Sequence, residues 1–160
     1  MTKTNTTPAT AADPTVAAAS AQFLTPLVLG LQALAVNGKQ AHWNVRGANF
    51  IAIHELLDSL VANAQAGADQ AAERIVALGL PVDARVSTVA AKTSTSVPAG
   101  FTQWEALIRD VIADMDIVIA DTQAAIDGLD EFDLTSQDVA IGIKETLEKD
   151  RWFLFAHLAE

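Results

Sequence analysis

The segment from Ala21 to Gly38 carries no charged side chain. Its leucines recur at helical spacing, so we expect it to lie within a first helix from about Val16 to Val45, with Pro26 in the first turns or marking a later start. A helix that is apolar on most sides must be covered by more than one partner. The segment therefore requires several further helices packed around it.

Three more segments show the helical period. The second is expected from Phe50 to about Leu78, the third from a capping box at Thr102–Glu105 to about Ile126, and the fourth from near Thr135 to about Leu158. A long connection, Leu80–Gly100, separates the second from the third and has room for one short helix. The pattern predicts an all-α four-helix bundle over residues 16–160, with a long connection between helices 2 and 3. Residues 1–15 are expected to form a flexible tail.

Composition limits the partners of such a bundle. The chain has no Cys, 20 acidic and 10 basic residues, and a net charge of −10. This charge repels nucleic acid and anionic membranes and attracts metal cations. The most apolar stretch, Phe23–Val36, is too short to span a bilayer and contains Gln32. Without a recognisable signal segment, we expect a cytoplasmic protein with no membrane partner.

Potential metal ligands gather near the end of the first predicted helix and along the second. They are His42, His54, Asp58, Asp69 and Glu73. Two pairs are four residues apart, so each pair lies on one face of a helix. Imidazole combined with carboxylate suits iron, zinc or manganese better than calcium. The stretch therefore predicts a metal site.

The spacing does not allow one helix to complete that site. Asp58 and Asp69 are eleven residues apart, which is roughly 16 Å of helical rise. A second copy of the helix, antiparallel across a two-fold axis, would bring His54 level with Glu73 and Asp58 level with Asp69, because both pairs of numbers add to 127. The result would be two equivalent sites per dimer.

His42 fits the same arrangement, because a turn near Ala48 would place it level with His54. Each site would then receive His42, His54 and Asp58 from one chain and Asp69 and Glu73 from the other. Taken singly, these residues are also compatible with ordinary helix-surface charges. Spacing alone leaves both interpretations open.

The sequence resembles a known family at these positions. The run His42-Trp43-Asn44-Val45-x-Gly47, then His54-x-x-x-Asp58, then Asp69-x-x-x-Glu73-Arg74-Ile75 and a closing Leu78-Gly79, is similar to the Dps family, the DNA-binding proteins from starved cells. The resemblance implies a ferritin-like bundle assembled into a homododecameric cage. It also implies ferroxidase sites at the two-fold interfaces, with the same division of the five ligands between subunits.

The implied activity is oxidation of Fe(II), preferably by hydrogen peroxide and otherwise by O2, with ferric oxide stored inside the cage. Each site would hold iron, up to two ions. Trp43 would lie beside the site as a possible electron donor, although a core aromatic is an equal alternative. The family's acidic iron-entry pores suggest Asp130, Glu131, Asp133 and Asp138, which could also be solvated helix-end acids. The ferritin motif Glu-x-x-His is absent from the chain, which favours the interface site.

The sequence departs from the family in its N-terminal tail, where Lys3 is the only basic residue and is opposed by Asp13. DNA binding and nucleoid association are therefore not favoured. Two alternative functions use the same ligands: a metal-dependent hydrolase with a metal-bound water as nucleophile, and a passive cage that binds metal or protects DNA without turnover.

Overall fold

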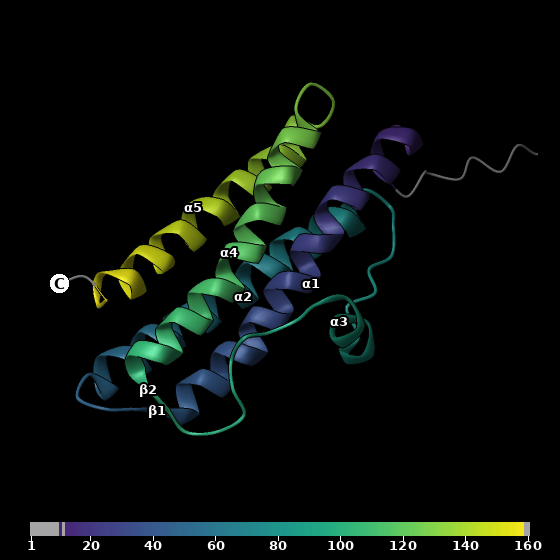
Figure 1. The fold of residues 1–160 in the computed structure, drawn as a ribbon. Coiled ribbons are helices and arrows are strands. Elements are labelled where there is room, and N and C mark those ends of the chain that lie inside the picture. Colours follow the sequence, from purple (N-terminus) through teal and green to yellow (C-terminus); the bar gives the residue numbers. More distant parts are fainter. Residues whose placement is uncertain (1–9, 11, 159–160) are drawn as a thin grey trace, which may run out of the picture.

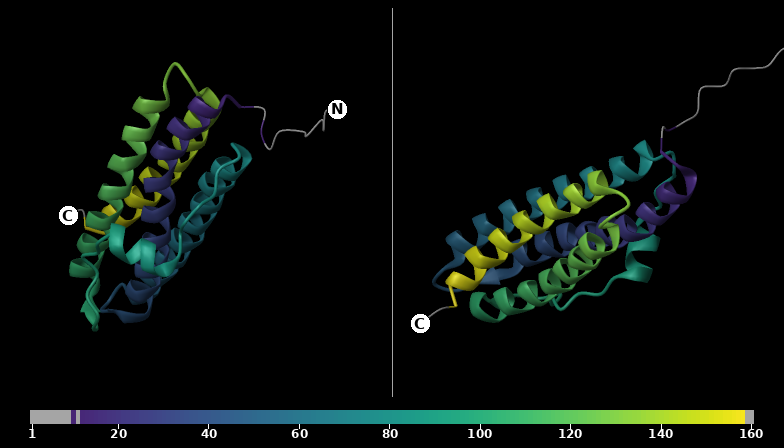
Figure 2. Two further views of the ribbon diagram at one scale, coloured as in Figure 1. Left: turned by 90° about the vertical axis from the view of Figure 1, so that its right-hand side faces the viewer. Right: turned by 90° about the horizontal axis from the view of Figure 1, so that it is seen from above.

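The computed structural model describes residue 10 and residues 12–158. Its elements, in chain order, are α1 (Pro14–Asn44), β1 (Val45–Arg46), α2 (Phe50–Ala77), α3 (Val86–Lys92), β2 (Thr102–Gln103), α4 (Trp104–Leu129) and α5 (Leu134–Ala156). Four long helices form the bundle, and α3 lies beside it in the long connection (Figures 1 and 2). The predicted fold class is confirmed.

Helix α1 begins within the segment that was predicted to be a tail. Asp13 is its N-cap, and the carboxylate accepts hydrogen bonds from the backbone N–H groups of Thr15 at 2.8 Å and Val16 at 3.3 Å. Residues 1–9 and 11 of the predicted tail lie outside the described residues. The expectation for Pro26 was wrong, because it lies deep inside α1. The helix continues through it because fully buried neighbours, Leu24 and Leu27, hold it against the core.

By length and hydropathy, α1 could cross a membrane, which the sequence prediction did not anticipate. However, 56% of its most apolar 18-residue window is buried inside the molecule. The apolar surface of α1 is thus used largely within the bundle, where it contacts α2 and α4.

The core lies between two helix pairs, α1 with α2 and α4 with α5 (Figure 2). Gly38 allows α1 to approach α2 closely, since a Cβ at this position would lie 2.9 Å from Cγ2 of Val61. The long connection is fixed to α4 by Asp114, whose carboxylate accepts hydrogen bonds from Oγ1 of Thr95 at 2.5 Å and from the backbone N–H of Ser96 at 2.7 Å. The connection is therefore held close to the bundle.

A short parallel pairing joins the α1–α2 turn to the start of α4. Val45 pairs with Thr102 and Arg46 with Gln103. The expected capping box was wrong: Gln103 is the N-cap of α4 and makes no side-chain capping bond. Thr102 is instead part of the strand pairing, an arrangement that depends on residues distant in sequence. The turn itself uses Gly47 at φ 115°, a backbone conformation that favours glycine.

Candidate metal centre

Two histidines meet where α1 and α2 come together. The rings of His42 and His54 stack with centroids 3.5 Å apart. Nδ1 of His42 donates to the backbone carbonyl of His54 at 2.9 Å, and Nδ1 of His54 donates to the carbonyl of His42 at 3.0 Å. A carbonyl oxygen only accepts, so Nδ1 of each ring carries the proton of its hydrogen bond. A ring that binds a metal here would do so through Nε2, the nitrogen that takes no part in these hydrogen bonds.

Asp58 lies one helical turn beyond His54, and its Oδ1 is 3.3 Å from Nδ1 of His42. Its side chain is half exposed and forms an ion pair with Lys39 of α1. The hydrogen bond from the Lys39 ammonium is the largest cause of the lowered pKa of Asp58. A carboxylate that is ionised and partly exposed is a suitable oxygen ligand for a divalent cation.

Asp69 and Glu73 lie farther along the same continuous helix, both exposed. Asp69 is eleven residues from Asp58, roughly 16 Å along the axis. Within residue 10 and residues 12–158, no group of three or more His, Asp or Glu side chains is arranged to hold a metal ion by itself. One chain thus places His42 in contact with both His54 and Asp58, without completing a metal-binding group, and leaves Asp69 and Glu73 apart from them.

The exposed surface of α2 between the two carboxylate pairs consists mostly of small side chains. Ala62, Gln65 and Ala66 are exposed on α2, while Ala64 and Ala68 face the core. Small exposed residues permit close approach of a second helix. The ligand pairs lie on either side of this stretch, as the antiparallel register requires.

Trp43 lies next to the histidines but outside the core, with 66% of its surface exposed. It lines a cavity of about 430 Å³ together with Arg46 and Phe50. The Phe50 ring centroid is 5.1 Å from that of His54. Trp43 is therefore not a core aromatic within one chain. Its role as an electron donor stays a prediction.

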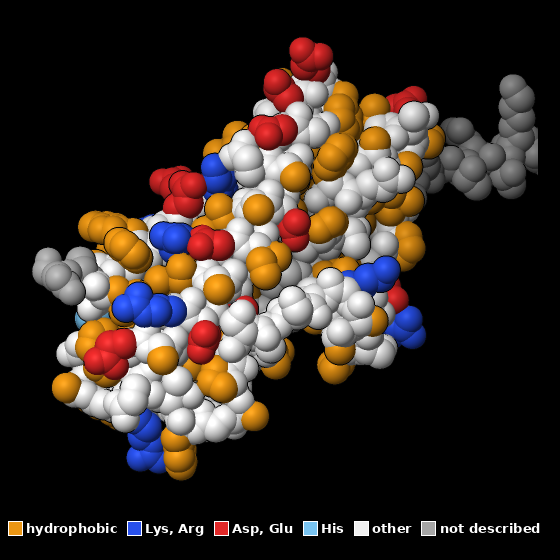
Figure 3. Space-filling model, viewed as in Figure 1, with side chains coloured by type: hydrophobic (Ala, Val, Ile, Leu, Met, Phe, Trp, Pro, Cys, Tyr) orange, Lys and Arg blue, Asp and Glu red, His pale blue; other side chains and the backbone are white. Residues whose placement is uncertain are grey.

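The four acids considered for an iron-entry pore divide into two groups. Asp130, Glu131 and Asp138 are exposed, and Figure 3 shows acidic side chains gathered at the end of the molecule where α4 joins α5. Asp133 is buried and caps α5. The pore stays a prediction, and the three exposed acids are the ones free to face solvent there.

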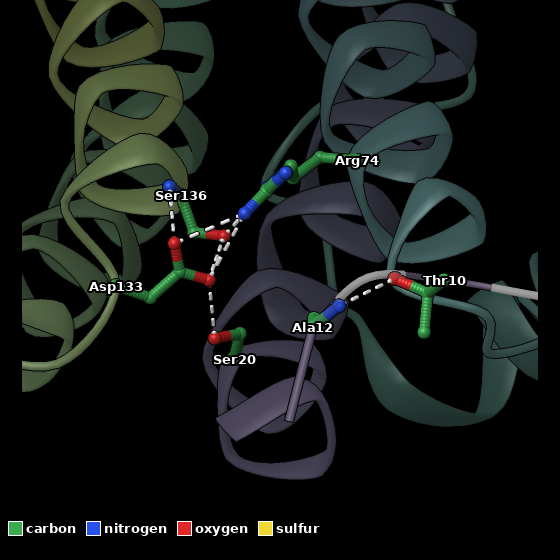
Figure 4. A network of polar contacts seen from close by, with 6 residues as sticks. All are labelled: Thr10, Ala12, Ser20, Arg74, Asp133 and Ser136. Carbon is green, nitrogen blue, oxygen red and sulfur yellow. Dashed lines mark hydrogen bonds and ion pairs between the residues drawn. The ribbon is translucent and has the colours of Figure 1, made fainter. Parts of the chain in front are cut away.

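Asp133 belongs to a polar network that joins three helices (Figure 4). Nη2 of Arg74 donates to Oδ1 at 3.0 Å and Oδ2 at 3.3 Å. Ser20 donates to Oδ2 at 2.6 Å, and Ser136 donates through its hydroxyl at 2.5 Å and its backbone N–H at 3.1 Å. Burial by itself would raise the pKa of Asp133. The hydrogen bonds from Ser136 and Ser20 and the charge of Arg74 together have the larger effect, so the net pKa of Asp133 is lowered.

Sequence reasoning missed the partners in this network and also missed Lys39. Arg74 follows Glu73 directly but turns away from it, with Nε donating to Ser136 at 2.9 Å. Nothing in the local sequence pairs residues this far apart. For Lys39 a signal exists: it is the first charge after the charge-free stretch and stands one turn before His42.

Comparisons with known proteins agree with this fold. Residues 24–160 match the ferritin-like domain family. A DNA protection during starvation protein from Agrobacterium fabrum is 35% identical over 129 residues, covering 79% of this chain and 80% of the relative. The corresponding protein from Mycolicibacterium smegmatis is 36% identical over 133 residues, covering 75% of this chain but only 66% of the relative.

Among solved structures, a Dps from Microbacterium arborescens in its high iron form is 73% identical, with a TM-score of 0.92. The match covers 93% of this chain and 98% of that one. A 20%-identical protein from Vibrio cholerae, TM-score 0.85, shares the fold. With the ferritin-like domain matched over most of its length and close Dps relatives in both sequence and structure, the chain belongs to the Dps family of ferritin-like proteins.

Proposed function

We propose that this chain is the subunit of a cytoplasmic iron-storage and detoxification cage of twelve copies. In this proposal, Fe(II) is oxidised at sites between two-fold related subunits, by hydrogen peroxide or by O2, and ferric oxide is stored inside. His42, His54 and Asp58 of one subunit and Asp69 and Glu73 of its partner bind the iron, with up to two ions per site.

The observation that carries the proposal is the half-site at the α1–α2 turn. The Nδ1 hydrogen bonds leave Nε2 of His42 and His54 outside these contacts, and Oδ1 of Asp58 lies 3.3 Å from Nδ1 of His42. Two imidazoles and one carboxylate are an incomplete donor set for a pair of metal ions. Two exposed carboxylates lie on the same helix at the spacing that a two-fold axis would bring opposite them.

The chemistry follows from the paired arrangement of substrate ions. Two Fe(II) ions each give up one electron to a single hydrogen peroxide molecule, whose O–O bond breaks to give two hydroxide ions. A lone Fe(II) ion supplies one electron only and releases a hydroxyl radical. The role of the five side chains is to hold both ions within reach of one oxidant.

An anaerobic titration followed by peroxide tests the proposal. Fe(II) is added to the apo protein, one peroxide per two Fe(II) is added, and ferric absorbance is followed in wild type and in the double variant Asp58→Ala, Glu73→Ala. We expect Fe(II) affinity and oxidation rate to fall at least about 100-fold in the variant, because changes beside metal ligands alone cost 10–100-fold.

A matched control changes two exposed acids away from the site, Asp127→Ala and Glu145→Ala, and should behave as wild type. Equal oxidation in wild type and in the ligand double variant would refute the site assignment. Binding without oxidation in wild type would favour a passive cage, and ester or amide cleavage dependent on Asp58 would favour a hydrolase.

DNA binding is expected to be weak. Each chain carries a net charge of −10, so a twelve-subunit cage would carry on the order of −120 before ions bind. Linear duplex DNA should not be retained in a gel shift at about 0.15 M salt, where phosphate contacts are already weakened. Retention at that salt concentration would contradict this expectation.

A further inference from the structure

A cavity of about 750 Å³ lies where α1, α4 and the connection that contains α3 meet, on the side of the bundle seen in Figures 1 and 3. None of the described residues that line it is one of the five proposed metal ligands. Its volume is within the range of about 300–1,000 Å³ that is typical of small-molecule sites. The cavity is therefore large enough for a ligand other than iron.

The floor of the cavity is apolar and belongs to two helices. The lining residues of α1 recur every three or four positions, and those of α4 do the same, so each set lies on one helix face. The apolar floor consists of buried residues: Leu29, Gly30, Ala33 and Leu34 of α1 and Val118 of α4. Gly30 allows the two faces to approach closely, because a Cβ there would lie 3.1 Å from Cγ2 of Val118. Such a floor favours a hydrocarbon group over a strongly hydrated one.

Three charged side chains also line the cavity: Asp114 and Asp121 of α4 and Lys92 of α3. Asp114 is buried and already accepts hydrogen bonds from Thr95 and Ser96, which hold the connection against α4. Lys92 is exposed at the end of α3. Because two carboxylates face one ammonium, the charge of the lining favours a cation over an anion.

Asp121 is the carboxylate that is open to such a cation. It lies seven residues beyond Asp114, which is two helical turns and roughly 10 Å along the same face of α4. It is half-buried, and it takes part in none of the ion pairs between described residues. A partly desolvated carboxylate forms a strong charge-assisted hydrogen bond with an ammonium group.

We propose that this cavity binds a small amphiphilic cation, a primary amine with a hydrocarbon body. The ammonium group pairs with Asp121, and the hydrocarbon lies on the apolar floor between α1 and α4. The cavity and the iron centre have no residue in common, so this inference goes beyond the proposed function and does not depend on it.

Calorimetric titration of the assembled protein with butyl-, hexyl- and octylammonium tests the proposal. We expect one ligand per subunit, with an affinity that rises about 4-fold for each added methylene, because each methylene leaves water for the apolar floor. Octanoate has a similar chain and the opposite charge. It should bind at least about 10-fold more weakly than octylammonium, because it meets the Asp121 carboxylate in place of an opposite charge.

Two variants locate the ligand, and a third is the matched control. Asp121→Asn should weaken octylammonium binding about 10-fold and leave the gain per methylene unchanged, because only the charged hydrogen bond is lost. Ala33→Phe places a ring on the apolar floor and should abolish binding. Asp127→Asn changes an exposed acid of α4 outside the cavity and should match wild type. Circular dichroism and size-exclusion elution establish that each variant folds and assembles, and Asp121→Asn decides the question by itself if Ala33→Phe does not assemble.

Several results would overturn the proposal. Equal octylammonium binding in wild type and Asp121→Asn would do so, as would equal weakening in Asp127→Asn. Tighter binding of octanoate than of octylammonium would assign the cavity to anions through Lys92.

The double variant Asp58→Ala, Glu73→Ala separates this inference from the proposed function. Octylammonium should bind to it as to wild type, whether or not the variant has lost Fe(II) oxidation. Loss of octylammonium binding there would place the cation at the proposed iron centre and would overturn the inference alone.

Discussion

Co-assembly of two inactive variants is expected to restore about a quarter of the wild-type Fe(II) sites. One variant carries Asp58→Ala and the other Glu73→Ala, and each is inactive when assembled alone. The two are unfolded together in equal amounts and allowed to assemble. In a mixed two-fold dimer, one site combines both defects. The other combines an intact Asp58 half with an intact Glu73 half. Random pairing makes about half of the dimers mixed, and each mixed dimer has one intact site of two.

The expectation follows from the separation of the ligands along α2. Asp58 and Glu73 lie in one uninterrupted helix, Phe50–Ala77, about 22 Å apart in rise. A single ion cannot contact both in one chain. Fe(II) binding per subunit, measured anaerobically before and after mixing, gives the recovered fraction directly.

Mixing two Asp58→Ala preparations is the negative control, and mixing wild type with itself corrects for losses in refolding. A site contained within one chain would show no recovery, because every chain in the mixture carries a defect. Recovery of none of the Fe(II) binding, with assembly intact by size exclusion, would therefore contradict the shared site.

Asp133→Ala is expected to lower the free energy of unfolding by roughly 2–5 kcal/mol, the range for removing one partner of a buried, hydrogen-bonded charge pair. The change removes the N-cap of α5 and leaves the Arg74 guanidinium without its carboxylate. It also removes the acceptor for the Ser20 hydroxyl, which links α1 to the start of α5. Denaturant unfolding at equal subunit concentration measures the loss, since assembly contributes to the apparent stability.

The pH dependence has a defined sign. The pKa of Asp133 is lowered in the folded chain, so its contribution is present above the ordinary aspartate pKa of about 3.9 and is lost as the pH falls through the lowered value. The stability difference between wild type and Asp133→Ala should therefore stay constant from about pH 7 to 5 and narrow below about pH 4.

Asp83→Ala is the matched control for this prediction. Asp83 also accepts two hydrogen bonds from an arginine, at 2.8 Å each from Nε and Nη2 of Arg85, but the pair is exposed on the long connection. Exposed pairs contribute little because water and salt screen them. A loss in Asp83→Ala as large as that in Asp133→Ala would show that burial is not the cause.

The sequence by itself determined the helices and indicated the candidate ligands. The charge-free stretch of α1 required several partner helices, and periodicity placed α2 and α5 within two residues of their observed ends. Such features depend on neighbours three and four residues away, which a sequence displays directly. The spacing of His54, Asp58, Asp69 and Glu73 indicated a shared site before any contact was known, and that assignment stays a prediction.

Only the tertiary structure decided which side chains are already engaged. Asp133 and Asp130 are both acids near the start of α5 in sequence, yet one is buried by Arg74, Ser20 and Ser136 and the other is exposed. Lys39 reaches Asp58, and His42 and His54 bond to each other's carbonyls, because α1 and α2 pack side by side. These contacts join residues on different elements, so their energies depend on packing geometry that local sequence patterns do not contain.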